Sequence, residues 1–322
     1  MKPSIFASLL GTLCISFATV ANAAFPDHSV RLLVGFPPGT GPDIVARTVG
    51  EQLSKNLGQS VVVENKAGAG GQIAAASIAN AASDGYSILL GEVGSISIAP
   101  ETTSELSYKP LQDFAPISEA VRANFVLVVP ANSQYHSLKE FVAGARESKQ
   151  HFNIATFGAG TPGHFGAEML ADEGGFDIEP VHYRTTGDAV SAIIAGQVQG
   201  AFVTTAMAGP QIESGRMRGL VITGSERNST LPNIPTLIES GMPATDFGAW
   251  FAFLAPAGTP EAALDVLNAN IIKALASDKA KATLQSNGFV TVGSSRQDLA
   301  KLLTDEQKRW AGVVKKTGFR IN

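Results

Sequence analysis

Short apolar runs alternate with longer amphipathic segments along most of this sequence, and this alternation restricts the fold more than any other feature. Val30–Phe36 is a continuous apolar run with β-branched residues, which is typical of a buried parallel strand. In Pro42–Asn56 the apolar residues share one helical face, and Gly58 follows as a C-terminal stop. The same alternation continues down the chain. It predicts an α/β fold with helices on both faces of a parallel sheet.

The same patterns place the remaining elements. The further strands expected are Ser60–Glu64, Ser87–Leu90, Phe125–Val129, Asn153–Phe157, Glu179–Tyr183, Gly200–Val203, Gly219–Thr223 and Ala249–Ala255. The further helices expected are Gln72–Asn80, one opened by a capping box at Ser137–Glu140, Pro162–Asp172, Asp188–Ala195, a short one near Pro210, Pro260–Ala276, Asp278–Asn287 and Arg296–Lys316. The stretch 100–116 contains three prolines and is expected to be irregular.

Length and the lack of a tether predict two lobes joined by strands. The sequence has 322 residues, which is long for one hydrophobic core, and it contains no low-complexity linker. The best crossover candidates are Ile117–Pro130 and Phe247–Pro256, where a few strand-end residues would act as a hinge. The predicted division is a first lobe of 24–123 with 247–322 and a second lobe of 124–246.

The N-terminus has the pattern of a secretory signal peptide, predicted to span 1–23. Lys2 provides a basic start, Ile5–Val20 is apolar, and Ala21–Ala23 fits the small-residue cleavage rule. A transmembrane anchor is the alternative, but the apolar run is short and ends in that cleavage site. We therefore expect a soluble mature chain that begins at Ala24 and is exported to the periplasm.

Cysteine usage and charge exclude several classes of site. Cys14 is the only cysteine and lies in the predicted signal peptide, so the mature chain has no thiol for disulfides, thiolate metal sites or nucleophilic catalysis. Leu13 precedes it where a lipoprotein signal needs a small residue, which argues against lipid anchoring. Without Lys2 the charge balance is 23 − 28 = −5. Because there is no basic block, nucleic acid is not expected as a partner.

A glycine-threonine-proline turn occurs once in each predicted lobe, where a strand runs into a helix. The first is Gly39–Pro42 and the second is Gly158–Gly163. Such a turn points unpaired backbone N–H groups outward at the positive end of the helix dipole, which suits an anion. Two such turns on two lobes would hold one small anion from both sides. The plainer interpretation is that glycine and threonine only turn the chain there.

Six ordered blocks of sequence resemble a known family. They are Val34–Arg47, Val62–Gly71, Asp84–Tyr86, Pro232–Thr236, Gly248–Phe251 and Leu254–Pro260. In this order and spacing they are similar to the Bug-type receptors, the extracytoplasmic solute-binding proteins of tripartite tricarboxylate transporters. The resemblance covers essentially the whole mature chain.

The resemblance implies a type II periplasmic-binding-protein fold, in which two Rossmann-like lobes are joined by crossover strands with a ligand cleft between them. It implies a monomer that closes on a small organic carboxylate, held by backbone N–H groups, hydroxyls and bridging water. The ligand would be a di- or tricarboxylate or an aromatic carboxylate. The implied partners are membrane transporter subunits, and no cofactor, metal or catalytic residue is implied.

The family's binding loops fall on six segments here. These are Phe36–Asp43, Ala67–Gly71, Gly91–Ser97, Thr156–His164, Tyr183–Asp188 and Val203–Thr205. The ligand contacts expected within them are Phe36, Gly39, Thr40, Gly41, Asp43, Ala69, Gly70, Gly91, Ser95, Thr156, Gly158, Ala159, Gly160, Thr161, His164, Arg184, Thr204 and Thr205. Many relatives have an acidic residue near the last loop, where it would pair with a substrate ammonium group. This sequence has none there, which favours a simple or aromatic carboxylate over an amino acid.

Several expected contacts also have a structural interpretation. Asp43 lies in the first turn of its helix, where stabilising the helix end is its favoured role. Thr40 and Thr161 each precede a proline at the start of a helix, and their hydroxyls would either cap these helices or face the ligand. His164 and Glu168 are four residues apart, which fits a surface or cleft-edge pair better than a metal or acid–base site.

Two further choices stay open. Arg184 is either a solvated loop cation or an attractor of the carboxylate. Trp250 and Phe251 lie in the second crossover strand, where core packing is favoured over stacking on an aromatic ligand.

Rival functions find less support in the sequence. The second turn matches the dinucleotide fingerprint G-x-G-x-x-G, but nicotinamide cofactors are cytosolic reagents and the chain is expected to be exported. An exported enzyme acting on a carboxylate is a second rival, and no G-x-S-x-G or H-E-x-x-H motif supports it. A receptor for a membrane sensor kinase is the third, and the sequence does not separate it from a transport receptor.

Overall fold

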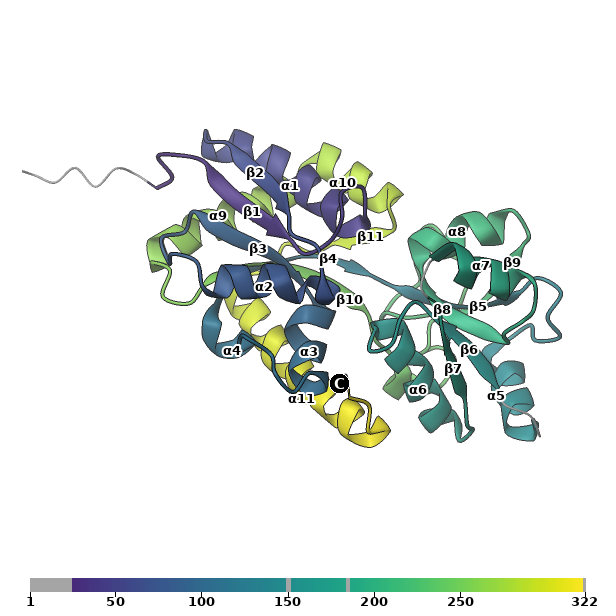
Figure 1. The fold of residues 1–322 in the computed structure, drawn as a ribbon. Coiled ribbons are helices and arrows are strands. Elements are labelled where there is room, and N and C mark those ends of the chain that lie inside the picture. The colour runs from purple at the N-terminus through teal and green to yellow at the C-terminus, as the bar shows by residue number, and fades with distance from the viewer. Residues whose placement is uncertain (1–24, 149–151, 184–185, 321–322) are drawn as a thin grey trace, which may run out of the picture.

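Two β-sheets lie in separate halves of the molecule, each with its own helices (Figure 1). The computed structural model describes residues 25–148, 152–183 and 186–320. The predicted signal peptide therefore lies outside the described residues. The α/β class predicted from the sequence is confirmed, because strands and helices alternate through both halves. The expectation of a parallel sheet is wrong in part, because both sheets also contain antiparallel pairs.

The first sheet has six strands in the order β11-β4-β10-β3-β1-β2. Strands β1, β2 and β3 are parallel, whereas β10 is antiparallel to both β3 and β4, and β11 is antiparallel to β4. The strands are β1 (Val30–Val34), β2 (Val61–Asn65), β3 (Ser87–Glu92), β4 (Phe114–Ala123), β10 (Ala249–Pro256) and β11 (Phe289–Thr291). The helices of these segments are α1 (Gly41–Leu57), η1 (Ala69–Gly71), α2 (Gln72–Ala79), η2 (Gly94–Ile98), α3 (Ala99–Thr102), α4 (Pro110–Asp113), α9 (Glu261–Leu275), α10 (Asp278–Ser286) and α11 (Arg296–Thr317).

The second sheet has five strands in the order β7-β6-β8-β5-β9. Strand β6 is parallel to β7 and β8, and β5 is antiparallel to β8 and β9. The strands are β5 (Phe125–Pro130), β6 (Asn153–Thr156), β7 (Glu179–His182), β8 (Gly200–Thr204) and β9 (Met217–Ile222). The helices are α5 (Leu138–Glu147), α6 (Pro162–Gly174), α7 (Thr186–Ile194), α8 (Thr205–Glu213) and η3 (Pro243–Thr245).

Helix α1 illustrates how local sequence sets an element. Val45, Val49 and Leu53 lie on its buried face with no exposed surface, as the apolar periodicity predicts. At its end Gly58 is in the left-handed conformation with φ 69°, and its N–H donates to Ser54 O at 3.0 Å. The predicted stop is therefore confirmed.

The capping box at the start of α5 is confirmed in one of its two hydrogen bonds. The N–H of Glu140 donates to Ser137 Oγ at 3.2 Å, which satisfies one free donor of the first turn. The carboxylate of Glu140 accepts from the N–H of His136 at 2.7 Å and not from that of Ser137. The second hydrogen bond of the capping box is thus made by the residue before the N-cap.

The expectation of irregular structure over 100–116 is confirmed for 103–109, between α3 and α4, and is wrong at both ends. Pro100 lies in the first turn of α3, and Pro110 is the first residue of α4, where a missing N–H removes no helical hydrogen bond. Pro116 lies inside β4 opposite Leu254, beside an irregularity in the register of β4 with β10. All three prolines therefore occupy positions in regular structure that tolerate them.

The chain crosses between the sheets at a narrow point. Only Asn124 separates β4 of the first sheet from β5 of the second. Its carbonyl accepts from the N–H of Thr205 at 3.0 Å, and a Cβ added to Gly224 would lie 2.8 Å from its Nδ2. The return crossing, between the end of β9 and the start of β10, thus begins beside the first.

Aromatic side chains make the core continuous across this point. The ring of Phe247 lies 5.0 Å from that of Phe125 and 5.1 Å from that of Phe202, between ring centroids. Trp310, near the end of α11, lies 5.7 Å from Phe165 of α6 by the same measure. Helix α11 therefore begins against the first sheet and ends against a helix of the second (Figure 1).

Both tryptophans donate to the same carboxylate. The indole Nε1 of Trp250 lies 3.1 Å from Glu306 Oε2, and that of Trp310 lies 2.9 Å from the same oxygen. Trp250 and Phe251 are 3% and 8% exposed, so the predicted packing of these side chains in the core is confirmed.

Within the described ranges, no helix combines the length and the apolar character that crossing a bilayer would need.

Candidate ligand-binding site

The loops predicted to bind a ligand leave both sheets at the edges that meet near Asn124. The directions of β1, β3, β10 and β4 place the carboxyl ends of β1, β2 and β3 at the edge where β4 ends. In the second sheet β5 starts at the crossing and is antiparallel to β8, so β6, β7 and β8 also end there. Ligands of open α/β sheets bind outside the carboxyl ends of strands, and here two such edges face one another.

The two threonine-proline turns have the same backbone geometry. Thr40 begins α1 with φ −80° and ψ 165°, and Thr161 begins α6 with φ −83° and ψ 159°. The hydroxyl of Thr40 donates to Pro37 O at 2.7 Å, and that of Thr161 donates to Gly158 O at 2.8 Å. Neither side chain caps its helix, which removes the capping interpretation. The N–H groups of the first helical turns stay available to an anion.

The carboxylate of Asp43 holds the first turn by accepting hydrogen bonds from three groups. Its Oδ2 accepts from the N–H of Gly39 at 2.9 Å and from Arg47 Nε at 3.0 Å, and its Oδ1 accepts from Asn65 Nδ2 at 2.8 Å. The residue is only 3% exposed. Burial raises the pKa of the Asp43 carboxyl, but these three donors outweigh it and hold the pKa below its ordinary value.

His164 has the matching position in the second turn. Its Nδ1 accepts from the N–H of Gly160 at 3.1 Å, and its Nε2 lies 3.7 Å from Glu168 Oε1. Its ring lies 4.9 Å from that of His182, whose Nδ1 is 2.6 Å from Thr156 Oγ1. His164 is 4% exposed, so the expectation of a surface or cleft-edge pair is wrong for the histidine. Its acceptor role turns the side chain inward.

Histidines and carboxylates do not combine into a metal site in the described part of the chain. No group of three or more His, Cys, Asp or Glu side chains there is arranged to hold a metal ion. The hydrogen-bond donors that the turns present instead suit an anion.

Close backbone approach brings the first-sheet loops together. A Cβ added to Gly35 would lie 2.4 Å from Gly71 Cα, so only glycine fits there. A Cβ on Gly71 would lie 3.4 Å from both the Phe36 ring and Ser95 Oγ. Asn65 Nδ2 also donates to Phe36 O at 3.0 Å. The loops after β1, β2 and β3 therefore form one surface.

Glu92 occupies the helix end that follows β3. Its carboxylate accepts from the N–H groups of Gly94 and Ser95, both at 2.8 Å. Burial raises the pKa of the Glu92 carboxyl, against the lowering effect of these hydrogen bonds. Gly91 lies within β3 opposite Ala252. This protein carboxylate already holds the place that a ligand anion would take at η2.

A segment of the first sheet links two helix starts of opposite lobes. The hydroxyl of Thr205, at the start of α8, donates to Gly288 O at 3.0 Å. The next residue, Phe289, lies under the start of α1, since a Cβ on Gly41 would be 3.0 Å from its ring. Thr204 precedes α8 as its half-exposed N-cap residue. The starts of α1 and α8 thus border the same segment.

The chain's last described residues connect the lobes at the second turn. The ring of Phe319 lies 5.1 Å from His164 and 5.7 Å from Phe165, between ring centroids. The guanidinium of Arg320 donates to the carbonyl of Glu101 on α3. Residues after α11 therefore reach both the N-terminus of α6 and the helix that follows η2.

The predicted contacts divide by exposure. The exposed or half-exposed ones are Phe36, Gly39, Thr40, Gly41, Ala69, Gly70, Gly158, Ala159, Gly160, Thr161 and Thr204. The buried ones, which support the loops from behind, are Asp43, Gly91, Ser95, Thr156, His164 and Thr205. Arg184 lies outside the described residues. Ligand contact by any of them stays a prediction.

Sequence reasoning missed the residues that hold the loops in place. Gly35 and Asn65 lie inside the family-like blocks and Glu92 lies at the end of β3, but none of the three was predicted to hold a loop in place. The four-residue spacing of Asp43 and Arg47 was a visible signal for the first of these networks. Nothing local predicts that Gly35 meets a loop that follows a different strand.

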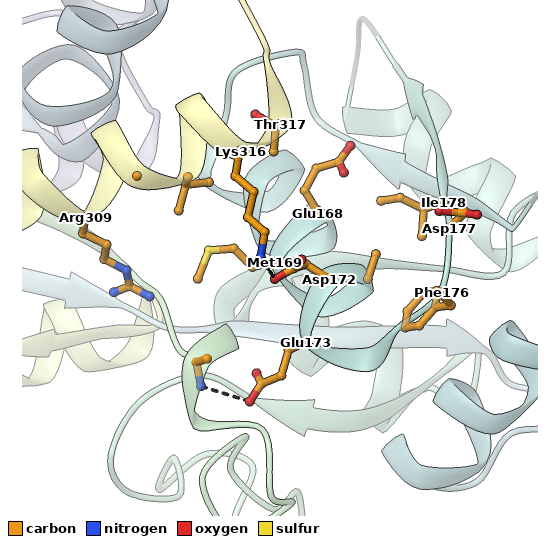
Figure 2. A pocket seen from close by; sticks show the side chains of 14 residues that line it. Glu168, Met169, Asp172, Glu173, Phe176, Asp177, Ile178, Arg309, Lys316 and Thr317 are labelled. Atoms are coloured by element: carbon orange, nitrogen blue, oxygen red, sulfur yellow. Dashed lines mark hydrogen bonds and ion pairs between the residues drawn. The ribbon is translucent and has the colours of Figure 1, made fainter.

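A separate cavity of about 480 Å³ lies between α6 and α11 (Figure 2). Glu168, Asp172 and Glu173 border it from α6, and Arg309 and Lys316 border it from α11. Lys316 forms an ion pair with Asp172 across it. None of the predicted ligand contacts lines this cavity, so the candidate site is the surface between the two turns.

Comparison with known proteins agrees with this geometry. The family model described as the tripartite tricarboxylate transporter family receptor matches residues 45–319. Protein BugT of Bordetella pertussis is 31% identical over 320 residues, covering 97% of this chain and 98% of BugT.

Three solved structures share both fold and sequence with this chain. The periplasmic binding protein BugD is 30% identical with a TM-score of 0.77, covering 92% of this chain and 99% of BugD. MatC from Rhodopseudomonas palustris with bound malate is 31% identical with a TM-score of 0.76, covering 90% and 100%. A second R. palustris protein, with adipate, is 29% identical with a TM-score of 0.80, covering 92% and 99%. These matches confirm the predicted periplasmic-binding-protein fold, and the chain belongs to the tripartite tricarboxylate transporter receptor family, whose members include the Bug proteins.

Proposed function

We propose that this receptor captures a small organic carboxylate between its two lobes in the periplasm and delivers it to a tripartite tricarboxylate-type transporter. The lobes are those predicted from the sequence, 24–123 with 247–322 and 124–246. The receptor acts as a monomer, and it performs no chemistry on its ligand.

The observation that supports this most is the matched pair of turns. Thr40 and Thr161 start two helices with the same backbone geometry, one in each lobe and each at the crossing edge of its sheet. Each offers N–H groups at the positive end of a helix dipole, and charged acceptors there are stabilised without any cationic side chain. Two such ends on opposite lobes suit a ligand with a carboxylate that both can reach.

Closure follows from differential affinity. A carboxylate that touches both turns does so only when the lobes approach, so it stabilises the closed form relative to the open one. The hinge would be the crossing at Asn124 and the neighbouring Gly224. Water bridging the carboxylate to the backbone costs at most about 2 kcal/mol per molecule.

The ligand class is drawn from the chain and from its relatives. MatC and the second R. palustris protein carry malate and adipate, both dicarboxylates. Near Thr204 and Thr205 this chain has no acidic side chain to pair with an ammonium group. A simple dicarboxylate or an aromatic carboxylate is therefore proposed over an amino acid.

Thermal unfolding tests the proposal directly. The mature chain would be unfolded and refolded to strip bound ligand and then scanned with malate, adipate, citrate, benzoate, aspartate and NAD. A ligand at ~1,000 times its Kd adds about 4 kcal/mol of stability, and each kcal/mol is worth roughly 2–4 °C at this size. We expect a large shift with one class of carboxylate.

Two matched variants assign the binding to the turns. Thr161→Val removes the hydroxyl that holds the second turn, and Thr304→Val removes an exposed hydroxyl that donates to Ala300 O in α11. We expect the first to weaken carboxylate binding roughly threefold to tenfold, the worth of about one hydrogen bond, and the second to leave it unchanged. A flat response to every carboxylate, or a shift with NAD alone, would refute the proposed function.

A further inference from the structure

In both turns a glycine N–H donates to a side chain four residues later. Gly39 donates to Asp43 Oδ2 at 2.9 Å, and Gly160 donates to His164 Nδ1 at 3.1 Å. Each glycine immediately precedes the threonine that begins the helix. Because helical side chains point back toward the N-terminus, a residue in the first turn can reach this N–H. The two acceptors are therefore equivalent in position.

The two acceptors differ in their chemistry. A carboxylate such as Asp43 accepts hydrogen bonds at any pH above its low pKa, and here the neighbouring Arg47 donates to the same oxygen. An imidazole accepts through Nδ1 only in the neutral form with the proton on Nε2, since both nitrogens of the cation are donors. Histidine ordinarily changes charge near pH 6.5, within the range of many bacterial surroundings.

We propose that Asp43 and His164 are paired positioning residues of the two turns, and that mild acidification opens the second turn while leaving the first intact. Protonation of His164 would leave the N–H of Gly160 without its acceptor and place two donors face to face. The second turn would then lose the geometry that presents its N–H groups to a carboxylate. This inference rests on the proposed function for its effect on ligand affinity, but its effect on the turn does not need a ligand.

The ring of His164 is surrounded by one carboxylate, a second histidine and two phenylalanine rings. On its own helix Glu168 Oε1 lies 3.7 Å from Nε2. On β7 the ring of His182 lies 4.9 Å away; burial first, and then His164, lower the pKa of His182, which favours its neutral form. The other two neighbours of the ring are uncharged: Phe319, which follows α11, and Phe165, the next residue in α6. The charged group that faces His164 is thus the carboxylate of Glu168.

Nitrogen-15 NMR of the ligand-free mature protein between pH 5 and 8 tests the turn itself. We expect the Gly160 amide proton to move upfield on acidification with the same midpoint as the His164 ring nitrogens. The Gly39 amide should stay unchanged over this range. His164→Asn provides the matched control, because the Asn Oδ1 takes the place of Nδ1 as an acceptor and does not titrate.

The variant separates the titration from a merely structural role. In His164→Asn the Gly160 amide should keep its position from pH 8 to pH 5. If Gly160 titrates unchanged in this variant, or if it does not titrate in the wild type, the inference is wrong. Either result leaves the proposed function standing, since no ligand takes part.

A calorimetric titration with adipate at pH 8 and pH 5 extends the test to binding. Protonation of adipate itself weakens binding at pH 5 equally in both proteins, so the two proteins are compared with each other. We expect the wild type to lose roughly threefold to tenfold more affinity than His164→Asn between pH 8 and pH 5, which corresponds to about one hydrogen bond. Equal loss in both proteins would refute the role of His164 in ligand release. Absence of any carboxylate binding at pH 8, with the NMR titration present, would instead count against the proposed function.

Discussion

At the residue scale, the direction of a side chain decides which of two neighbours four residues away it contacts. The sequence shows Asp43 and Arg47 four apart and His164 and Glu168 four apart, so both pairs could be predicted. It did not show that Asp43 and His164 also reach back four residues to a glycine N–H, because that contact depends on the turn geometry before the helix. The helix-end role predicted for Asp43 agrees with Oδ2, which accepts from Gly39 in the turn and Arg47 in α1, whereas Oδ1 accepts from Asn65 at the end of β2.

Replacing Asp43 tests this role. Asp43→Ala removes a buried acceptor that receives hydrogen bonds from Gly39, Arg47 and Asn65. We expect the free energy of unfolding at pH 7 to fall by roughly 1–3 kcal/mol. Denaturant unfolding measures this. Asp305→Ala, which loses only an exposed pair with Lys301, should cost less than about 1 kcal/mol.

The same substitution has a definite pH dependence. The pKa of Asp43 is lower in the folded protein than its ordinary value, so its contribution to stability is complete above the unfolded pKa of about 4 and is lost as the pH falls through the folded pKa. The stability difference between wild type and Asp43→Ala should therefore shrink on acidification below about pH 5. A difference that grows toward low pH would contradict the assignment.

At the element scale, the periodic helices and the short apolar strands were predictable, whereas β11 and the short helices α3 and α4 were not. Helices α1, α9 and α11 begin and end within one or two residues of their predicted bounds, because each carries several turns of apolar periodicity. Strand β11 has three residues, too few for any pattern, and exists because it pairs with β4. The prolines of α3 and α4 predicted irregular structure, whereas helices accept proline in their first turn.

The packing of the turn after β1 on η1 gives a prediction at this scale. A Cβ at Gly35 would meet the backbone of Gly71 at 2.4 Å, and backbone cannot move aside as a flexible side chain does. We expect Gly35→Ala to cost roughly 1–3 kcal/mol of stability and to weaken carboxylate binding by displacing the loop that bears Gly70.

Gly312 in α11 provides the matched control. A Cβ there meets nothing within 4 Å, so Gly312→Ala should stabilise the protein by roughly 0.5–1 kcal/mol through helix propensity. Thermal unfolding of both variants measures the contrast. Equal effects of the two substitutions would show that the approach of Gly35 to Gly71 is not tight in solution.

At the scale of the whole molecule, the sequence predicted two sheets and the strands that cross between them, but not the helix that joins them. The crossings follow from element order, which the chain itself specifies. Helix α11 was predicted as a helix, yet its contact with α6 through Trp310 links residues far apart in sequence. The same holds for the candidate site, whose loops were named from the resemblance, whereas their mutual contacts come from the sheet registers.

Lobe closure predicts a change in overall dimensions. Because a ligand shared by both turns stabilises the closed form, a saturating carboxylate from the thermal panel should reduce the radius of gyration measured by small-angle X-ray scattering. Thr161→Val should need a higher ligand concentration for the same reduction, whereas Thr304→Val should match the wild type. Calorimetric binding without any reduction would show capture in the absence of closure.

The sharing of Glu306 by Trp250 and Trp310 has an optical consequence. These are the only two tryptophans of the chain, and both indole N–H groups point at one carboxylate oxygen beside the crossing, from β10 and from α11. All the tryptophan emission of the protein therefore originates at the place where the two lobes join. The ring of Trp310 also packs on Phe165 of α6 in the second lobe. A rotation of that lobe therefore changes the surroundings of this indole and with them its emission wavelength. Tryptophan fluorescence of the unlabelled protein therefore reports on the movement of the two lobes.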